Sequence, residues 1–94
     1  MTLIIAQGKF WTGRIVITSG AQSELSQDEV LEGLARHVAG DWGDVDEDDR
    51  KENEFSLEHG FRLLSSYATP RGTKFWIITE HDRSVTTILL PEEY

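Results

Sequence analysis

The hydrophobic positions of this chain gather in short runs of β-branched and aromatic residues, separated by glycine, proline and polar residues. The three clearest runs are residues 61–68, 73–80 and 84–90. They predict a C-terminal meander of three strands joined by tight turns. Both alternating faces of residues 73–80 are apolar, so we expect a central strand there, with Trp76 in the core. Residues 3–6 and 14–18 are shorter strand candidates near the N-terminus.

Residues 27–39 follow the helical period instead. Ser26 and Glu29 fit a capping box, in which each side chain accepts a hydrogen bond from the backbone N–H of the other residue. The apolar residues that follow recur at helical spacing, and Gly40 is a natural stop. The sequence therefore predicts a helix over residues 27–39, preceded by one irregular helical turn at residues 21–25.

A second helix is expected to begin after Asp44 or Asp46, either of which can cap it, and to end at residues 59–60, which are His-Gly. Its pattern is only weakly amphipathic. At 100° per residue, Asn53 shares an inner face with small and apolar neighbours. Phe55 projects on the opposite face, among Asp48, Lys51 and Glu58. The helix is therefore expected to carry an aromatic side chain on its acidic outer face.

Together these elements predict an α+β fold. A small antiparallel sheet, made of the C-terminal three-stranded meander and one or two N-terminal strands, is expected to pack against two helices. The chain has 94 residues, of which 38% are hydrophobic and 28% charged, an ordinary globular composition. We expect a single domain over residues 1–94, because domains usually contain roughly 100–200 residues.

The formal net charge of −8 is concentrated in one segment. Residues 41–60 contain nine acidic and two basic side chains, whereas the rest of the chain is nearly neutral. Nucleic acids and anionic membranes attract basic surfaces, so we expect neither of them as a direct partner. The acidic segment is then either a solvated helix that keeps the protein soluble or a surface that docks on a basic partner.

The cysteine count and the start of the chain bear on the compartment. There is no cysteine, which excludes disulfides, thiolate metal sites and cysteine nucleophiles and fits a reducing cytoplasm. The apolar start at residues 1–6 lacks a basic region before it and is too short for a signal peptide. No apolar run approaches the roughly 20 residues that span a bilayer. We therefore expect a cytoplasmic protein.

No motif of the sequence carries recognisable enzyme chemistry, so we expect no catalytic residue, cofactor or metal. Residues 44–48 resemble the opening of an EF-hand loop, but Asp49 and Phe55 occupy the positions that require glycine and glutamate. His37 and His59 are expected to complement the dipoles at the two helix C-termini. His81 is expected in an exposed turn between two strands.

The candidate interaction residues combine the acidic outer face of the second helix with exposed aromatic rings. They are Asp48, Glu52, Phe55, Glu58 and Trp11. A phenylalanine ringed by carboxylates suits a partner with an apolar pocket and a basic rim, unless the N-terminal segment folds over it. Phe10 and Trp11 form an aromatic patch if they lie outside the core. Trp42 is expected to wedge the turn between the helices against the sheet.

A long, ordered set of motifs connects the chain to a family. The motifs are residues 36–44 (RHVAGDWGD), 62–65 (RLLS) with Tyr67, 72–80 (GTKFWIITE), 82–84 (DRS) and 86–94 (TTILLPEEY). Over residues 36–94 the chain resembles small bacterial proteins that are generally labelled hypothetical or plasmid-related, some of them as type I restriction methylase subunits. A methyltransferase needs a cofactor-binding glycine loop and an Asn-Pro-Pro-aromatic motif, and the sequence contains neither. The resemblance implies an accessory role on mobile DNA.

Two main hypotheses follow. In the first, a non-enzymatic cytoplasmic accessory protein of a plasmid or phage binds a basic protein partner through its acidic helix and inhibits a host defence complex, such as CRISPR or restriction. In the alternative, the chain is a small enzyme or a small-molecule or metal-binding protein. Its site would surround the turn at residues 40–45 and use His37, Asp41, Asp44 and Arg62. A third hypothesis is an assembly partner with no exposed chemistry.

Overall fold

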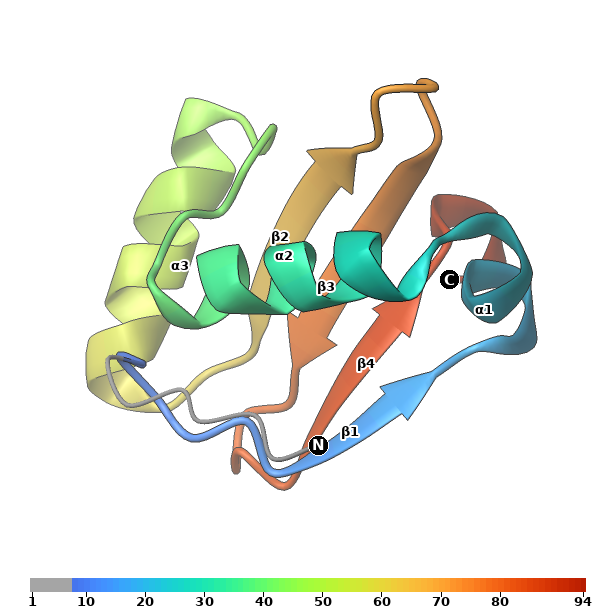
Figure 1. Cartoon of the computed structure of the whole chain (residues 1–94). Helices are drawn as coiled ribbons and strands as arrows, with labels where there is room; N and C mark the ends of the chain where they lie inside the picture. The colour runs from blue at the N-terminus through green and yellow to red at the C-terminus, as the bar shows by residue number, and fades with distance from the viewer. Residues whose placement is uncertain (1–7) are drawn as a thin grey trace.

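The computed structural model describes residues 8–94, and the strand expected at residues 3–6 lies outside them. The elements in chain order are β1 (Arg14–Ile17), α1 (Ser19–Glu24), α2 (Gln27–Val38), α3 (Glu47–His59), β2 (Leu63–Ala68), β3 (Lys74–Thr79), β4 (Val85–Leu89) and a 3₁₀ turn η1 (Pro91–Glu93). The strands form one sheet in the order β1-β4-β3-β2, with α2 across one face (Figure 1). The expected α+β class is confirmed. None of the helices within residues 8–94 is long and apolar enough to cross a membrane.

The sheet is mixed rather than wholly antiparallel. β2, β3 and β4 form the expected antiparallel meander, in which Ile77 of β3 lies between Ser65 and Ile88. β1, however, runs parallel to β4, with Ile17 opposite Ile88. The alternation of apolar and polar side chains along a strand is the same for either direction of pairing, so the sequence pattern did not reveal this.

The main core lies between α2 and the sheet. It includes the buried side chains of Leu34, Phe75, Ile77 and Ile88. Gly33 allows the helix to lie close to the strands, because a Cβ atom there would be only 2.9 Å from the ring of Phe75. The expected capping box at the start of α2 is present, with both of its reciprocal hydrogen bonds.

Two element boundaries differ from expectation. The turn expected at residues 21–25 is part of α1, because the Thr18 hydroxyl accepts a hydrogen bond from the Ala21 N–H and starts a helix at Ser19. The described chain thus has three α-helices, not the two that were expected. β2 begins at Leu63 rather than at Phe61, because the Phe61 N–H bonds the last turn of α3 instead of a strand.

α3 lies beside β2, along the edge of the sheet (Figure 1). The Asn53 side chain donates to the Leu64 carbonyl at 2.8 Å and accepts from the Leu64 N–H at 3.1 Å. Further along the strand, the backbone N–H of Ser66 donates to the Trp42 carbonyl, and the Ser66 carbonyl accepts from the Asp44 N–H. The outward backbone groups of β2 at Leu64 and Ser66 are therefore all paired, and this edge of the sheet is closed along these residues.

Trp76 lies on the sheet face opposite α2. Its strand is central, as expected, but the side chain is only partly buried and does not belong to the main core. The ring packs edge-on against the exposed Tyr94, with the centroids 5.5 Å apart. The expectation that Trp76 belongs to the core was wrong, because α2 covers only the other face of the strand.

Candidate functional site

The local sequence of α3 stabilises a helix even though few of its side chains are buried. Asp46, rather than Asp44, caps the N-terminus by accepting from the Asp49 N–H at 2.8 Å. The acidic residues 47–49 lie in the first turn, where the helix dipole favours negative charge. Gly60 ends the helix with a left-handed φ of 74°, which glycine adopts without strain.

The acidic face of α3, formed by Asp48, Glu52, Phe55 and Glu58, points away from the sheet. All four residues are exposed, whereas Asn53 and Ser56 on the inner face are buried. Phe55 keeps 51% of its surface exposed. The structure thus brings four of the five candidate interaction residues together on one helix surface.

Phe55 is paired with Phe61, which the sequence pattern had placed inside a strand. The two rings stack at 5.8 Å with 8° between their planes, and 53% of Phe61 is exposed. The Phe61 N–H bonds the Ser56 carbonyl, which is the 6→1 hydrogen bond of a Schellman motif, and the Gly60 N–H bonds the same carbonyl, as in the simpler αL motif. A phenylalanine directly after the terminal glycine, six residues beyond Phe55, was the signal that could have predicted this contact.

His59 completes this aromatic group. It lies in the last turn of α3, as expected, and its ring centroid is 4.2 Å from that of Phe55. Its Nε2 is 3.7 Å from a carboxylate oxygen of Glu58. The C-terminal end of the acidic face therefore presents a continuous aromatic surface of Phe55, His59 and Phe61.

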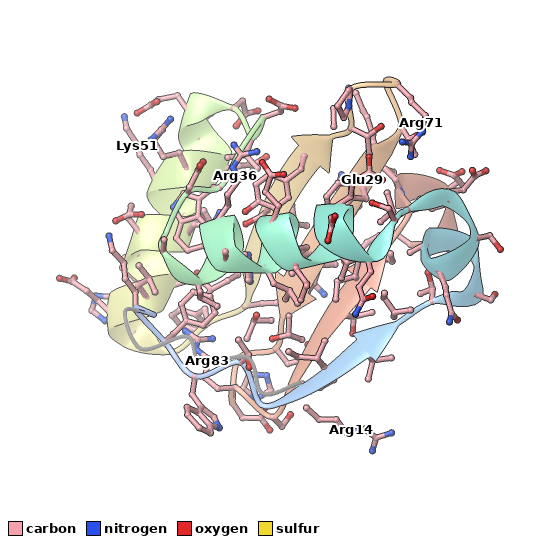
Figure 2. The ribbon with its side chains drawn as sticks, viewed as in Figure 1. Arg14, Glu29, Arg36, Lys51, Arg71 and Arg83 are labelled. Carbon is pink, nitrogen blue, oxygen red and sulfur yellow. The ribbon has the colours of Figure 1, made fainter. Side chains whose placement is uncertain are left out.

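Arg83 connects the end of α3 to the rest of the molecule (Figure 2). Its guanidinium donates to the carbonyls of Ser56 and Phe61 at 3.1 and 2.7 Å, so a cation lies at the helix C-terminus. The same group also donates to the Glu80 carbonyl and lies 5.7 Å from the centre of the Phe10 ring. Arg83 thus joins α3, the β3–β4 turn and the N-terminal segment.

Trp11 lies in that N-terminal segment and not on the acidic face of α3. It is 79% exposed, although its neighbour Phe10 is anchored between Trp42 and His37. Trp42 is buried and donates a 2.7 Å hydrogen bond to Glu54, which agrees with its expected wedge position between the helices. Trp11 is therefore an exposed aromatic side chain whose segment meets the end of α3 through Arg83.

His37 is fully buried, so the expectation that it complements the α2 dipole as a cation was wrong. Burial, together with the nearby positive charge of Arg83, lowers the pKa of His37 to about 3. The imidazole is consequently neutral at physiological pH, and a neutral ring provides no charge to a helix end. The reason is tertiary: the last turn of α2 lies against the sheet, and the rings of Phe10 and Trp42 pack against the imidazole.

A chain of hydrogen bonds defines the tautomer of His37. Thr86 donates to the Thr12 carbonyl, so its oxygen accepts the 2.7 Å hydrogen bond from Thr79. Thr79 in turn accepts from Nε2 of the imidazole at 2.9 Å, and Nδ1 accepts from the Ser65 hydroxyl at 2.5 Å. Both ring nitrogens are thus bonded to hydroxyl groups, and Ser65 is fully buried, so this serine–histidine pair lies inside the core rather than at a surface.

The residues of the alternative site, around the turn at residues 40–45, do not converge. Asp41 forms a two-pronged ion pair with Arg36 at 2.7 and 3.2 Å, which lowers the pKa of Asp41. His37 is directed into the core, and Arg62 stacks instead on the C-terminal tyrosine ring. Within residues 8–94, no group of three or more potential side-chain ligands is arranged to hold a metal ion.

Hollows border the helices within residues 8–94. One of about 300 Å³ lies between α2 and the β2–β3 hairpin, and its charged residues Glu29 and Arg36 are already paired with Arg71 and Asp41. Another, of about 260 Å³, lies between α3 and the start of β2 and includes Glu52.

Comparisons of the chain with protein-family models, with curated proteins and with solved structures give no match.

Proposed function

We propose that the protein is a non-enzymatic, cytoplasmic accessory protein of a plasmid or phage. In this proposal the acidic face of α3 binds a basic surface on a protein partner, and the partner is a host defence complex of the CRISPR or restriction type. The observation that carries the proposal is the half-exposed Phe55, which lies among carboxylates on a helix whose inner face is occupied by polar contacts to β2.

The charges on this face are available to a partner. Neither Asp48 nor Glu52 forms an ion pair with another described residue, and both are exposed. The face also carries the exposed Lys51, but its carboxylates outnumber this cation. A net negative surface creates a field that speeds encounter with a basic surface and selects among partners. Carboxylates spaced along a helix can also occupy the positions that a partner uses to bind phosphate groups.

The aromatic rings supply the apolar part of the proposed interface. Phe55 and Phe61 support one another at the helix end, so their position costs little conformational entropy when a partner binds. A desolvated aromatic side chain surrounded by polar residues is the usual composition of an interface hot spot. The acidic face would therefore combine electrostatic attraction at its rim with an apolar anchor at one end.

The test begins with affinity capture from the native host and continues with the purified partner. Binding should weaken steeply as salt rises, and the combined reversals Asp48→Lys, Glu52→Lys and Glu58→Lys should abolish it. The matched control is the triple variant Glu24→Lys, Glu32→Lys and Glu92→Lys, which makes the same change in net charge at exposed positions outside α3. Binding that is insensitive to salt and survives the α3 reversals would contradict the proposal.

A further inference from the structure

The two edges of the sheet differ in the way they end. The edge at β2 is closed by Asn53 and by residues 42–44, as described above. β1 is the strand at the other edge, and no element of residues 8–94 lies beyond it in Figure 1. Arg14 and Ile15 of this strand are exposed, Ile15 by 43%.

The hydrogen bonds to β4 identify which backbone groups of β1 point outward. Arg14 donates to the Ser84 carbonyl, and Thr18 donates to the Ile88 carbonyl. Residues of a strand alternate, so Val16 also faces β4, and the N–H and C=O groups of Ile15 and Ile17 face away from the sheet. The residues between Arg14 and Thr18 include no proline, glycine or charge, which are the usual devices that block an open edge.

We propose that this edge pairs with the same edge of a second copy of the chain, antiparallel, about a two-fold axis at Val16. In an antiparallel ladder, residues directly opposite one another must both face the partner strand or both face away from it. A symmetric pairing centred on Val16 meets this rule: Ile15 lies opposite Ile17 of the second copy, and these residues exchange hydrogen bonds. This register also gives the longest overlap, from Arg14 to Thr18.

The side chains complement one another in this register. Arg14 lies opposite Thr18 of the second copy, on the same face of the sheet. The Thr18 hydroxyl donates a 2.5 Å hydrogen bond to the exposed carboxylate of Glu93, which also accepts from the N–H groups of Gly20 and Leu90. This carboxylate forms no ion pair within residues 8–94, and it lies beside the position that Arg14 reaches. At the two-fold axis, Val16 lies opposite Val16 of the second copy. The two-fold symmetry forms the charge contact twice.

The distribution of charge permits this association. Each copy carries a net charge of −8, most of it in residues 41–60, which lie beside the opposite edge of the sheet. Repulsion between the acidic segments is therefore weakened by distance and screened by salt. A strand of four residues buries less than the roughly 1,200–2,000 Å² of a standard interface, so the expected dimer depends on concentration.

A cysteine placed at the axis tests the register directly, because the natural chain has none. Opposed residues that do not exchange hydrogen bonds have Cα atoms about 4.5 Å apart, which lies within the range of a disulfide. Val16→Cys should therefore form a covalent dimer on mild oxidation. Ile15→Cys is the control: its thiol is exposed, but its counterpart is displaced by two residues, roughly 7 Å along the strands.

Sedimentation equilibrium of the wild-type protein provides a second readout that needs no cysteine. We expect a dimer that forms as concentration rises to about 1 mM, and Arg14→Glu should weaken it at least tenfold. Lys74→Glu, which makes the same change in charge at an exposed position of β3, should leave the dimerisation constant unchanged.

A wild-type protein that stays monomeric, together with a Val16→Cys variant that crosslinks no better than Ile15→Cys, would overturn the pairing. That result is also expected if residues 3–6 occupy the edge instead. Either outcome leaves the proposal for α3 unaffected, since the acidic face lies on another surface.

Discussion

At the scale of single residues, the burial of His37 has the clearest effect on the free energy of unfolding. Its imidazole is fully buried and hydrogen bonded at both nitrogens, to Ser65 and Thr79. Protonation would place a second proton on Nδ1, which accepts from the Ser65 hydroxyl, and would bring a charge into the core near Arg83. The native state therefore resists protonation of this ring.

The pH dependence of stability follows with a definite sign. The pKa of His37 is about 3 in the folded protein and near 6.5 in the unfolded chain, so between pH 6.5 and about pH 3 only the unfolded chain takes up the proton. This contribution to the free energy of unfolding is fully present above pH 6.5 and falls by about 2 kcal/mol between pH 7 and pH 5. Urea unfolding at these pH values measures the change.

The control for this prediction is His81→Gln, which removes an exposed histidine of the β3–β4 turn and leaves the buried His37 in place. His37→Gln should reduce the slope if the variant folds. The wild-type protein offers an independent measurement by NMR. An imidazole resonance of His37 that titrates with a midpoint near 6.5 would contradict the buried, neutral state.

Phe55 carries a prediction about binding rather than folding. Phe55→Ala keeps a strong helix former in α3 and leaves Phe61 without its stacking partner. We expect a loss of about 1 kcal/mol in stability and at least tenfold in affinity for the captured partner, as for an interface hot spot. Tyr94→Ala, at an exposed aromatic side chain outside α3, should leave the affinity unchanged. Equal losses of affinity for the two variants would show that Phe55 does not contribute specifically to the interface.

At the scale of elements, α3 is held by few but specific contacts. Its inner face buries Asn53 and Ser56 rather than a row of large apolar side chains. The amide of Asn53 replaces a neighbouring strand for Leu64, and Arg83 bonds the helix end. A helix attached through polar contacts to a sheet edge leaves most of its surface free, which is why so many carboxylates are tolerated on it.

Asn53→Ala tests this attachment. Removing the side chain leaves the Leu64 N–H and C=O without their partner at a partly buried position, so we expect a loss of about 2–3 kcal/mol in the free energy of unfolding. Hydrogen exchange at the Leu64 amide should also accelerate. Glu52→Ala, next to it on the exposed face, should cost less than about 0.5 kcal/mol. Unchanged protection of Leu64 would show that the edge is closed by other contacts.

At the scale of the whole molecule, the distance between the helix layer and the sheet is set by Gly33. Gly33→Ala favours the helix by up to about 1 kcal/mol through propensity. The added Cβ would lie 2.9 Å from Phe75, however, and overpacking of this kind typically costs about 1–3 kcal/mol. We expect net destabilisation, measured by thermal or urea unfolding. Added stability would show that α2 can move away from the sheet at little cost.

Much of the fold was predictable because local patterns determine it. The capping box at Ser26, the strands of the C-terminal meander and the outward position of Phe55 depend on residues within a few positions of one another. Local patterns were less informative where one residue had two uses. Phe61 has the character of a strand residue, but its N–H closes α3, so that β2 begins only at Leu63.

The sequence by itself determined the α+β class, the concentration of charge in residues 41–60 and the acidic face of α3, because composition and periodicity encode them directly. Only the tertiary structure decided that β1 runs parallel to β4 and forms an edge of the sheet within residues 8–94, that α3 lies along the other edge, and that His37 is buried and neutral. These features depend on contacts between residues far apart in the chain. The free energy that stabilises them comes from burial and from hydrogen bonding between different elements, and no local sequence pattern specifies either.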